Sequence, residues 1–206
     1  MNRLRPTEQN AIGYNILIAA IFILSLWVAK HPYLGIVHDA RYYLLQTLHA
    51  LEPTRWNEDL FFRYGSQDSF SIFSSVYKWP VGAIGIAAAN LLAIVIGDGL
   101  WLASLGLLVC SILNRPTERL AAACGVIALN TGYGGLDTLH YAEPFITPRL
   151  FAEAAVMCGF AAASRGRYVL LSMLSLLAAA IHPLSALPGI GIITFDSLRR
   201  DRRTWS

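Results

Sequence analysis

Three carboxylates in the polar part of the chain have surroundings that suit proton transfer or cation binding. Asp39 follows a long apolar stretch, and Glu58 and Asp59 lie further along the same polar segment. A carboxylate at a boundary between membrane and water serves as a general base, and an acidic pair ligates a divalent metal. The structural alternatives are a helix N-cap at Asp39 and a solvated turn at Glu58 and Asp59. We take all three as candidate catalytic residues and leave the identity of any divalent metal cofactor open.

A second polar segment carries side chains that suit an anionic ligand. It contains His140, Glu143 and Arg149, and the Thr147-Pro pair before Arg149 is typical of a helix start with threonine as the cap. Arg149 then lies at the membrane surface, where a guanidinium binds a phosphate bidentately or extends to lipid headgroups. His182 lies at another helix end, as a ligand, a proton carrier or a cap.

Two further carboxylates, Asp98 and Glu153, fall inside apolar stretches. Because a charge inside a bilayer is costly, each is a candidate functional residue. Glu153 follows Arg149 by four residues, so a local ion pair between them is the alternative explanation. Asp98 lies between two glycines, and this triplet indicates a break in the helix.

The composition indicates a membrane protein. Of the 206 residues, 55% are hydrophobic and 14% are charged, whereas a soluble domain carries about 25% charged residues. The net charge of +3 does not indicate a nucleic-acid partner, because the basic residues form short clusters and no continuous patch. The sequence lacks the motifs of ATPases, nucleotide-cofactor enzymes, common serine hydrolases and zinc proteases. Its three cysteines match no metal spacing.

The apolar stretches predict an all-α polytopic bundle that forms one transmembrane domain. We expect about six spans, at residues 11–29, 87–113, 120–135, 149–163, 168–182 and 184–198. Residues 30–86 form a long first outer loop that contains interfacial helices. Within it, residues 39–51 have the pattern of an amphipathic helix, and residues 70–85 that of a helix anchored at the interface by Trp and Lys.

Arginine clusters predict the orientation of the bundle. With residues 70–87 at the surface, four basic clusters fall on one side: Arg3/Arg5, Arg115/Arg119, Arg165/Arg167 and the arginines of residues 199–203. The positive-inside rule assigns this side, with both termini, to the cytoplasm. All five histidines then lie on the outer face. We expect His31 and His49 at the interface or on helix surfaces, and His38, His140 and His182 nearer to Asp39.

The arrangement resembles integral-membrane glycosyltransferases of the GT-C fold. These proteins begin with one span, continue with a long outer loop that carries an early catalytic carboxylate, and follow it with a span closed by a basic cytoplasmic turn. The sequence Asp39-x-x-Tyr42 is similar to the Asp-x-x-Tyr that begins this loop in many bacterial members. The segments of residues 143–149 and 182–188 are similar to an uncharacterised bacterial membrane family of the same general shape.

The resemblance implies a polyprenyl-phosphate-linked sugar as donor, on the outer face of the bacterial inner membrane. Asp39 would deprotonate the acceptor hydroxyl. Arg149, with Lys78 or Arg63, would stabilise the leaving lipid phosphate. We expect Asp39, Arg149, His140 and Glu143 to share one polar pocket that faces an outer cavity.

Two alternatives remain open. GT-C proteins have more core spans than this chain, so we expect a truncated product, a half that needs a partner subunit, or a non-catalytic relative. A small transporter or a non-catalytic membrane subunit would instead use Asp98, Glu153 and His182. The polar residues concentrate in the outer loops, which favours the glycosyltransferase.

Overall fold

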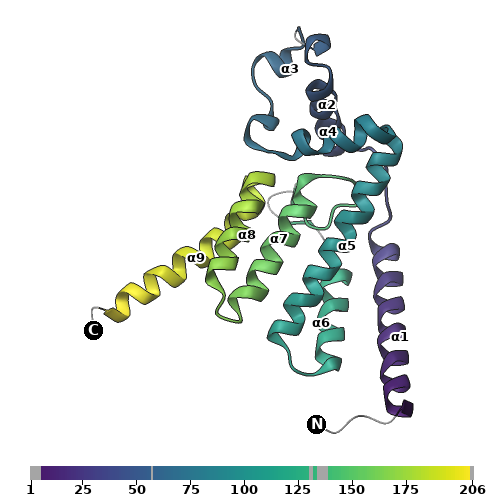
Figure 1. Cartoon of the computed structure of the whole chain (residues 1–206), viewed down its shortest axis with the longest axis vertical. Coiled ribbons are helices and arrows are strands. Elements are labelled where there is room, and N and C mark those ends of the chain that lie inside the picture. The colour runs from purple at the N-terminus through teal and green to yellow at the C-terminus, as the bar shows by residue number, and fades with distance from the viewer. Residues whose placement is uncertain (1–5, 57, 130–131, 134–138, 205–206) are drawn as a thin grey trace.

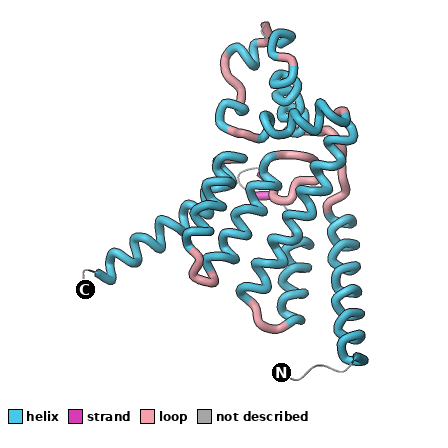
Figure 2. The backbone as a smooth tube through the Cα atoms, in the orientation of Figure 1, coloured by secondary structure: helices cyan, strands magenta, loops and turns pink. Residues whose placement is uncertain are grey.

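The protein is all-helical apart from one pair of very short strands. The computed structural model describes residues 6–56, 58–129, 132–133 and 139–204. The strands β1 (Gly132–Tyr133) and β2 (Leu139–His140) follow the helix Pro116–Ala128 in the sequence, precede the helix Pro148–Ala163, and pair antiparallel (magenta in Figure 2). The predicted all-α class is therefore confirmed for the described part of the chain.

Six helices form the lower body of the molecule (Figure 1). They are α1 (Pro6–Lys30), α5 (Ile86–Ile112), α6 (Pro116–Ala128), α7 (Pro148–Ala163), α8 (Tyr168–Ile181) and α9 (Pro183–Thr204). Helix α7 packs against α5, α8 and α9, whereas α1 packs against α6. Helix α7 is thus the central element, and the first turn of this helix carries Arg149.

The upper part of the molecule is formed by residues 31–85, which we call the 31–85 segment. Its helices are α2 (Asp39–Leu51), η1 (Pro53–Trp56), α3 (Leu60–Arg63), η2 (Gln67–Phe70) and α4 (Phe73–Ile84). The predicted amphipathic helix 39–51 is confirmed with the same bounds. Helix α4 corresponds to the expected interfacial helix and exposes Trp79, with Lys78 Nζ 5.7 Å from the centroid of that ring.

The helices differ from the predicted spans in length. Among the described helices, α5 is the one that is both long and apolar enough to cross a membrane. The helix at the predicted span 120–135 is α6, which begins at Pro116 and ends at Ala128. Proline suits the first position of a helix, and Glu118 in the first turn complements the helix dipole. At 13 residues, α6 is about 20 Å long, which is shorter than a hydrocarbon core of about 30 Å.

Helix α5 continues without a break through Gly97-Asp98-Gly99, so the expected interruption at this triplet is wrong. Gly97 instead lies where α5 meets α7. A Cβ at Gly97 would lie 3.2 Å from Leu150 Cγ and 3.4 Å from Phe151 Cζ. The missing side chain therefore allows the two helices to pack closely beside Arg149.

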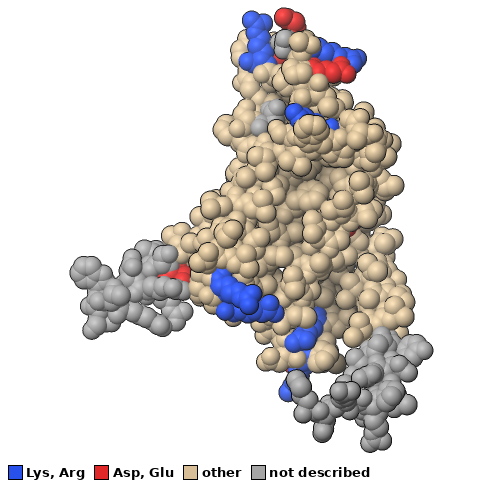
Figure 3. Space-filling view, viewed as in Figure 1, with Lys and Arg blue, Asp and Glu red and all other residues tan. Residues whose placement is uncertain are grey.

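The exposed arginines of two turns lie at one end of the molecule. Figure 1 places the α5–α6 turn, with Arg115, and the α7–α8 turn, with Arg165 and Arg167, at the end where α1 begins, opposite the 31–85 segment. On the face shown in Figure 3, a nearly uncharged belt separates the two ends. This is the distribution that the arginine clusters predict. Arg3, Arg5 and the side chains of residues 199–203 lie outside the described residues.

The loop before α7 joins the 31–85 segment to the bundle. The backbone N–H of Leu34 donates to the carbonyl of Pro144 at 2.9 Å. Phe145 and Ile146 are buried in one apolar cluster with Ala40 and other residues of α2 and α4. Burial of these side chains fixes the start of α2 next to the start of α7.

Candidate functional site

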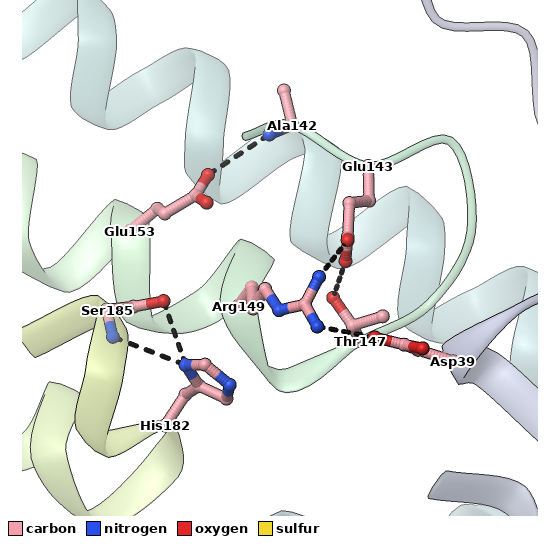
Figure 4. Close-up of polar contacts among 8 residues, drawn as sticks. All are labelled: Asp39, Ala142, Glu143, Thr147, Arg149, Glu153, His182 and Ser185. Atoms are coloured by element: carbon pink, nitrogen blue, oxygen red, sulfur yellow. Dashed lines mark hydrogen bonds and ion pairs between the residues drawn. The ribbon is translucent and has the colours of Figure 1, made fainter. Parts of the chain in front are cut away.

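The start of α2 places Asp39 against α7. His38 occupies the N-cap position with a φ of 45° and makes no side-chain cap, and Asp39 is the first helical residue. The Asp39 carboxylate accepts a hydrogen bond from Arg149 Nη2 (Figure 4). The N-cap interpretation of Asp39 is therefore wrong, and the expected proximity to Arg149 is confirmed.

Arg149 lies between two carboxylates. Its Nη1 donates to Glu143 Oε1, while Nη2 bonds Asp39. Thr147 occupies the N-cap position of α7 but makes no side-chain cap. Its hydroxyl instead donates to Glu143 Oε2 at 2.5 Å. We call Asp39, Glu143, Thr147 and Arg149 the ion-pair cluster.

The two carboxylates of the ion-pair cluster differ in exposure. The side chain of Glu143 is 2% exposed and that of Asp39 is 42% exposed, against 13% for Arg149. Burial raises the pKa of Glu143, although the hydrogen bond from Thr147 and the charge of Arg149 act in the opposite direction. Arg149 Nε is buried and has no hydrogen-bond partner in the described part of the chain. One donor of the guanidinium is thus unused.

A cavity of about 1040 Å³ adjoins the ion-pair cluster. Its walls are mostly apolar, from α6, α7 and α9, and include Val126, Leu129, Val156, Met157, Phe160, Leu184 and Leu187. Arg149 lines the cavity, whereas Asp39 does not line it and bonds Arg149. The shape suits a ligand with a long apolar part and a polar head.

His182 lies between α8 and α9 and lines the same cavity. Its Nδ1 accepts a hydrogen bond from the Ser185 backbone N–H at 3.3 Å and lies 2.9 Å from the Ser185 hydroxyl (Figure 4). Burial, and then the charge of Arg149, lower the pKa of His182 to about 4. The ring is therefore neutral at pH 7, with its proton on Nε2 as a hydrogen-bond donor.

Glu153 also lines the cavity. It does not pair with Arg149, so the interpretation as a local i,i+4 ion pair is wrong. Glu153 Oε2 accepts hydrogen bonds from Trp101 Nε1 at 2.9 Å and from the Ala142 backbone N–H at 3.1 Å (Figure 4). Arg149 pairs instead with Asp39 of α2 and with Glu143 of the loop before α7.

The tyrosine at this site is Tyr43, not the Tyr42 of the Asp-x-x-Tyr pattern. Tyr43 is buried and lines the cavity, while Tyr42 is exposed and lies 6.1 Å from the ring of Phe61. Positions 39 and 43 share one helix face because they are four residues apart. Burial raises the pKa of Tyr43 to about 12, so its hydroxyl keeps its proton. The spacing of four residues from Asp39 is the sequence signal that could have identified Tyr43.

Three other predicted site residues, Glu58, Asp59 and Arg63, do not line the cavity. Asp59 caps α3 by accepting from the Phe61 backbone N–H at 2.8 Å, and Glu58 and Arg63 are exposed. The solvated turn is thus the interpretation that fits Glu58 and Asp59. Among the described residues, no group of three or more His, Cys, Asp or Glu is placed to hold a metal.

The histidines differ in burial and in their position relative to the cavity. His140, in β2, is half-buried and acts electrostatically on Glu143. The expected surface position of His31 is wrong, because His31 is buried and its Nδ1 lies 3.0 Å from the Ala142 carbonyl. His49 stacks on Phe62 with a centroid separation of 4.0 Å. Of the five, His182 is the one that lines the cavity.

Comparisons of this chain with known proteins found no relative. No family model, curated protein or solved structure matches the chain.

Proposed function

We propose that this chain is an integral membrane protein that binds a lipid-linked sugar phosphate in the cavity and transfers the sugar to an acceptor hydroxyl. The observation that supports it most directly is a mostly apolar cavity whose lining includes Arg149, His182 and Tyr43. The volume, about 1040 Å³, is at the upper end of ordinary ligand pockets. It accommodates a sugar phosphate and the first part of an isoprenoid chain.

Binding of the phosphate would change the partners of Arg149. A phosphate oxygen competes best with Asp39, because Asp39 is the more exposed of the two carboxylates and Glu143 is held by Thr147 as well. Glu143 then keeps the guanidinium in place, and Arg149 Nε supplies a further donor. The exchange releases Asp39 from its ion pair at the moment when a base is required.

The released Asp39 would take the proton of the acceptor hydroxyl. The acceptor oxygen forms a bond to the anomeric carbon, and the bond from that carbon to the lipid phosphate oxygen breaks. The lipid phosphate leaves with the bonding electron pair. Arg149 and the Nε2–H of neutral His182 stabilise its charge. Membrane lipid is the surrounding partner, and the cytoplasmic membrane of a bacterium, with the arginine-rich turns inside, is the proposed location.

A transfer assay tests this function. The full chain is reconstituted in lipid nanodiscs with a radiolabelled polyprenyl-phosphate sugar and the products are separated from the donor. Asp39→Asn should reduce transfer by about 10²-fold or more, which is the usual contribution of a general base. Asp59→Asn is the matched control, because Asp59 caps α3 in an exposed position and asparagine preserves the cap. Equal rates for wild type and Asp39→Asn would remove Asp39 from the mechanism.

A transporter is the second candidate, because Glu153 lies within α7 and lines the cavity. Proton-dependent or ion-dependent uptake by the purified chain in liposomes would support it, if Glu153→Gln abolished that uptake. Transfer activity without uptake would exclude it.

A further inference from the structure

The two charged side chains that line the cavity belong to one face of α7. Arg149 and Glu153 are separated by one turn, a rise of about 6 Å along the helix axis. Each is oriented by its own partners: Arg149 by Asp39 and Glu143, and Glu153 by Trp101 and Ala142. The cavity is therefore lined by a guanidinium and a carboxyl group on adjacent turns of α7, and these two groups do not form an ion pair with each other.

Arg149 has ion-pair partners in the described structure, whereas Glu153 has none. Two carboxylates contact Arg149, but Glu153 forms no ion pair with any described residue. Both hydrogen bonds to Glu153 end on Oε2, which leaves Oε1 without either donor. A buried carboxyl group without a cation relieves the cost of its charge by taking up a proton, so a ligand that supplies a cation here would pair with the charged form.

Two aromatic residues lie beside this carboxyl: Trp101, which is buried, and Tyr141, which is half-buried. Trp101 and Tyr141 line the cavity with their rings within 7° of parallel and 6.2 Å apart between centroids. Trp101 also donates its indole N–H to Glu153. A carboxylate bordered by aromatic rings recognises an ammonium group, because the ring faces attract the cation and the carboxylate accepts its N–H bonds. A metal ion fits less well, since no group of three or more His, Cys, Asp or Glu among the described residues is placed to hold one.

We infer that Glu153, Trp101 and Tyr141 form a subsite for a primary ammonium group carried by the same ligand whose phosphate contacts Arg149. The inference rests on the proposed function and specifies the substrate class. The ligand is a lipid phosphate with an amine on its polar head. Two sources carry this chemistry: an isoprenoid phosphate linked to an amino sugar, and an ethanolamine phospholipid.

Binding of paired lipids to the full chain in a nonionic detergent tests the subsite. One pair is dihexanoyl phosphatidylethanolamine and dihexanoyl phosphatidylglycerol, which are both phosphodiesters. The other is farnesyl phosphate linked to an amino sugar and farnesyl phosphate linked to the corresponding neutral sugar. Calorimetry gives the dissociation constants. In at least one pair, the amine-bearing lipid should bind about tenfold more tightly, and that pair identifies the source.

Variants assign the preference to the subsite. Glu153→Gln should bring the affinity ratio of that pair close to one, and Trp101→Phe should reduce it because the N–H donor that orients Glu153 is lost. Glu118→Gln is the matched control, since Glu118 lies on α6 and pairs with Arg115 at 3.6 Å on the surface. This variant should keep the ratio of the wild type.

The outcomes separate the two proposals. If wild type binds both members of each pair equally, the ammonium subsite is wrong and the lipid-phosphate function stands. If wild type binds none of the four lipids, the proposed function fails and the subsite fails with it. An amine preference that persists in a folded Glu153→Gln variant would also overturn the assignment to Glu153.

Discussion

Arg149 of α7 donates a hydrogen bond to Asp39, the first residue of α2, across 110 positions of sequence. The bond lies at the junction of the 31–85 segment and the helix bundle. Glu143 completes the arrangement from the loop that precedes α7. The same contact therefore joins the two parts of the molecule and positions the proposed base.

Loss of the buried carboxylate should destabilise the protein. Glu143→Gln removes one charge of a buried pair and weakens the acceptor for Thr147. Arg149 keeps its ion pair with Asp39, so the loss should be about 1.5–3 kcal/mol, the contribution of a hydrogen bond to a charged group, and the denaturation midpoint in detergent should fall. Glu118→Gln changes an exposed pair and should alter the free energy of unfolding by less than about 1 kcal/mol. Equal midpoints for the two variants would contradict the role of Glu143.

The contact between α5 and α7 should depend on Gly97. Gly97→Ala places a methyl group against Leu150 and Phe151, and overpacking of this kind costs about 1–3 kcal/mol. Gly99→Ala is the control on the same helix, because nothing lies within 4 Å of its added Cβ. Alanine there should be neutral or stabilising by up to about 1 kcal/mol, from its higher helix propensity. Thermal unfolding of both variants measures the difference, and equal thermal midpoints would argue against close packing at Gly97.

His182 should make the stability depend on pH. Its folded-state pKa of about 4 lies below the ordinary value of 6.5, so between these values the unfolded chain binds a proton that the folded chain does not. Stability should fall as the pH is lowered from about 6.5 to about 4. The raised pKa of Glu143 gives the opposite slope, but it is present in both wild type and His182→Asn. The difference between their pH profiles therefore isolates His182.

One result of this pH experiment would contradict the prediction. A His182→Asn profile parallel to that of wild type from pH 6.5 to 4 would show that His182 is not held neutral by the fold.

The orientation in the membrane can be tested with single cysteines. In a background with Cys110, Cys124 and Cys158 replaced by alanine, Thr54→Cys in η1 should react with an impermeant thiol reagent in intact cells. Thr117→Cys should react only after permeabilisation. Both positions are exposed, so protection reports the membrane and not burial. Labelling of the cysteine at position 117 from outside would reverse the proposed orientation.

Local signals in the sequence were sufficient for several elements. The apolar periodicity of residues 39–51 predicted α2, and the Thr-Pro pair predicted the start of α7. A long apolar run predicted α5 to within a residue at each end. Helix periodicity and N1 proline are determined by neighbours along the chain, so one sequence is enough to reveal them. The proximity of Asp39 to Arg149 was also predicted, because charge placement assigned both to one end of the bundle.

The partners of individual side chains were decided by the tertiary structure. Local rules offered a cap role for Asp39 and an ion pair between Arg149 and Glu153, and both were wrong. Thr147 does occupy the N-cap position of α7, but its hydroxyl makes no cap bond. Each of these groups is satisfied instead by a residue from another element or from the preceding loop. A polar group that is buried on folding takes the partner that the packing of distant segments brings within hydrogen-bond distance. That packing depends on close approaches such as Gly97 against Leu150, which no pattern of neighbouring residues encodes.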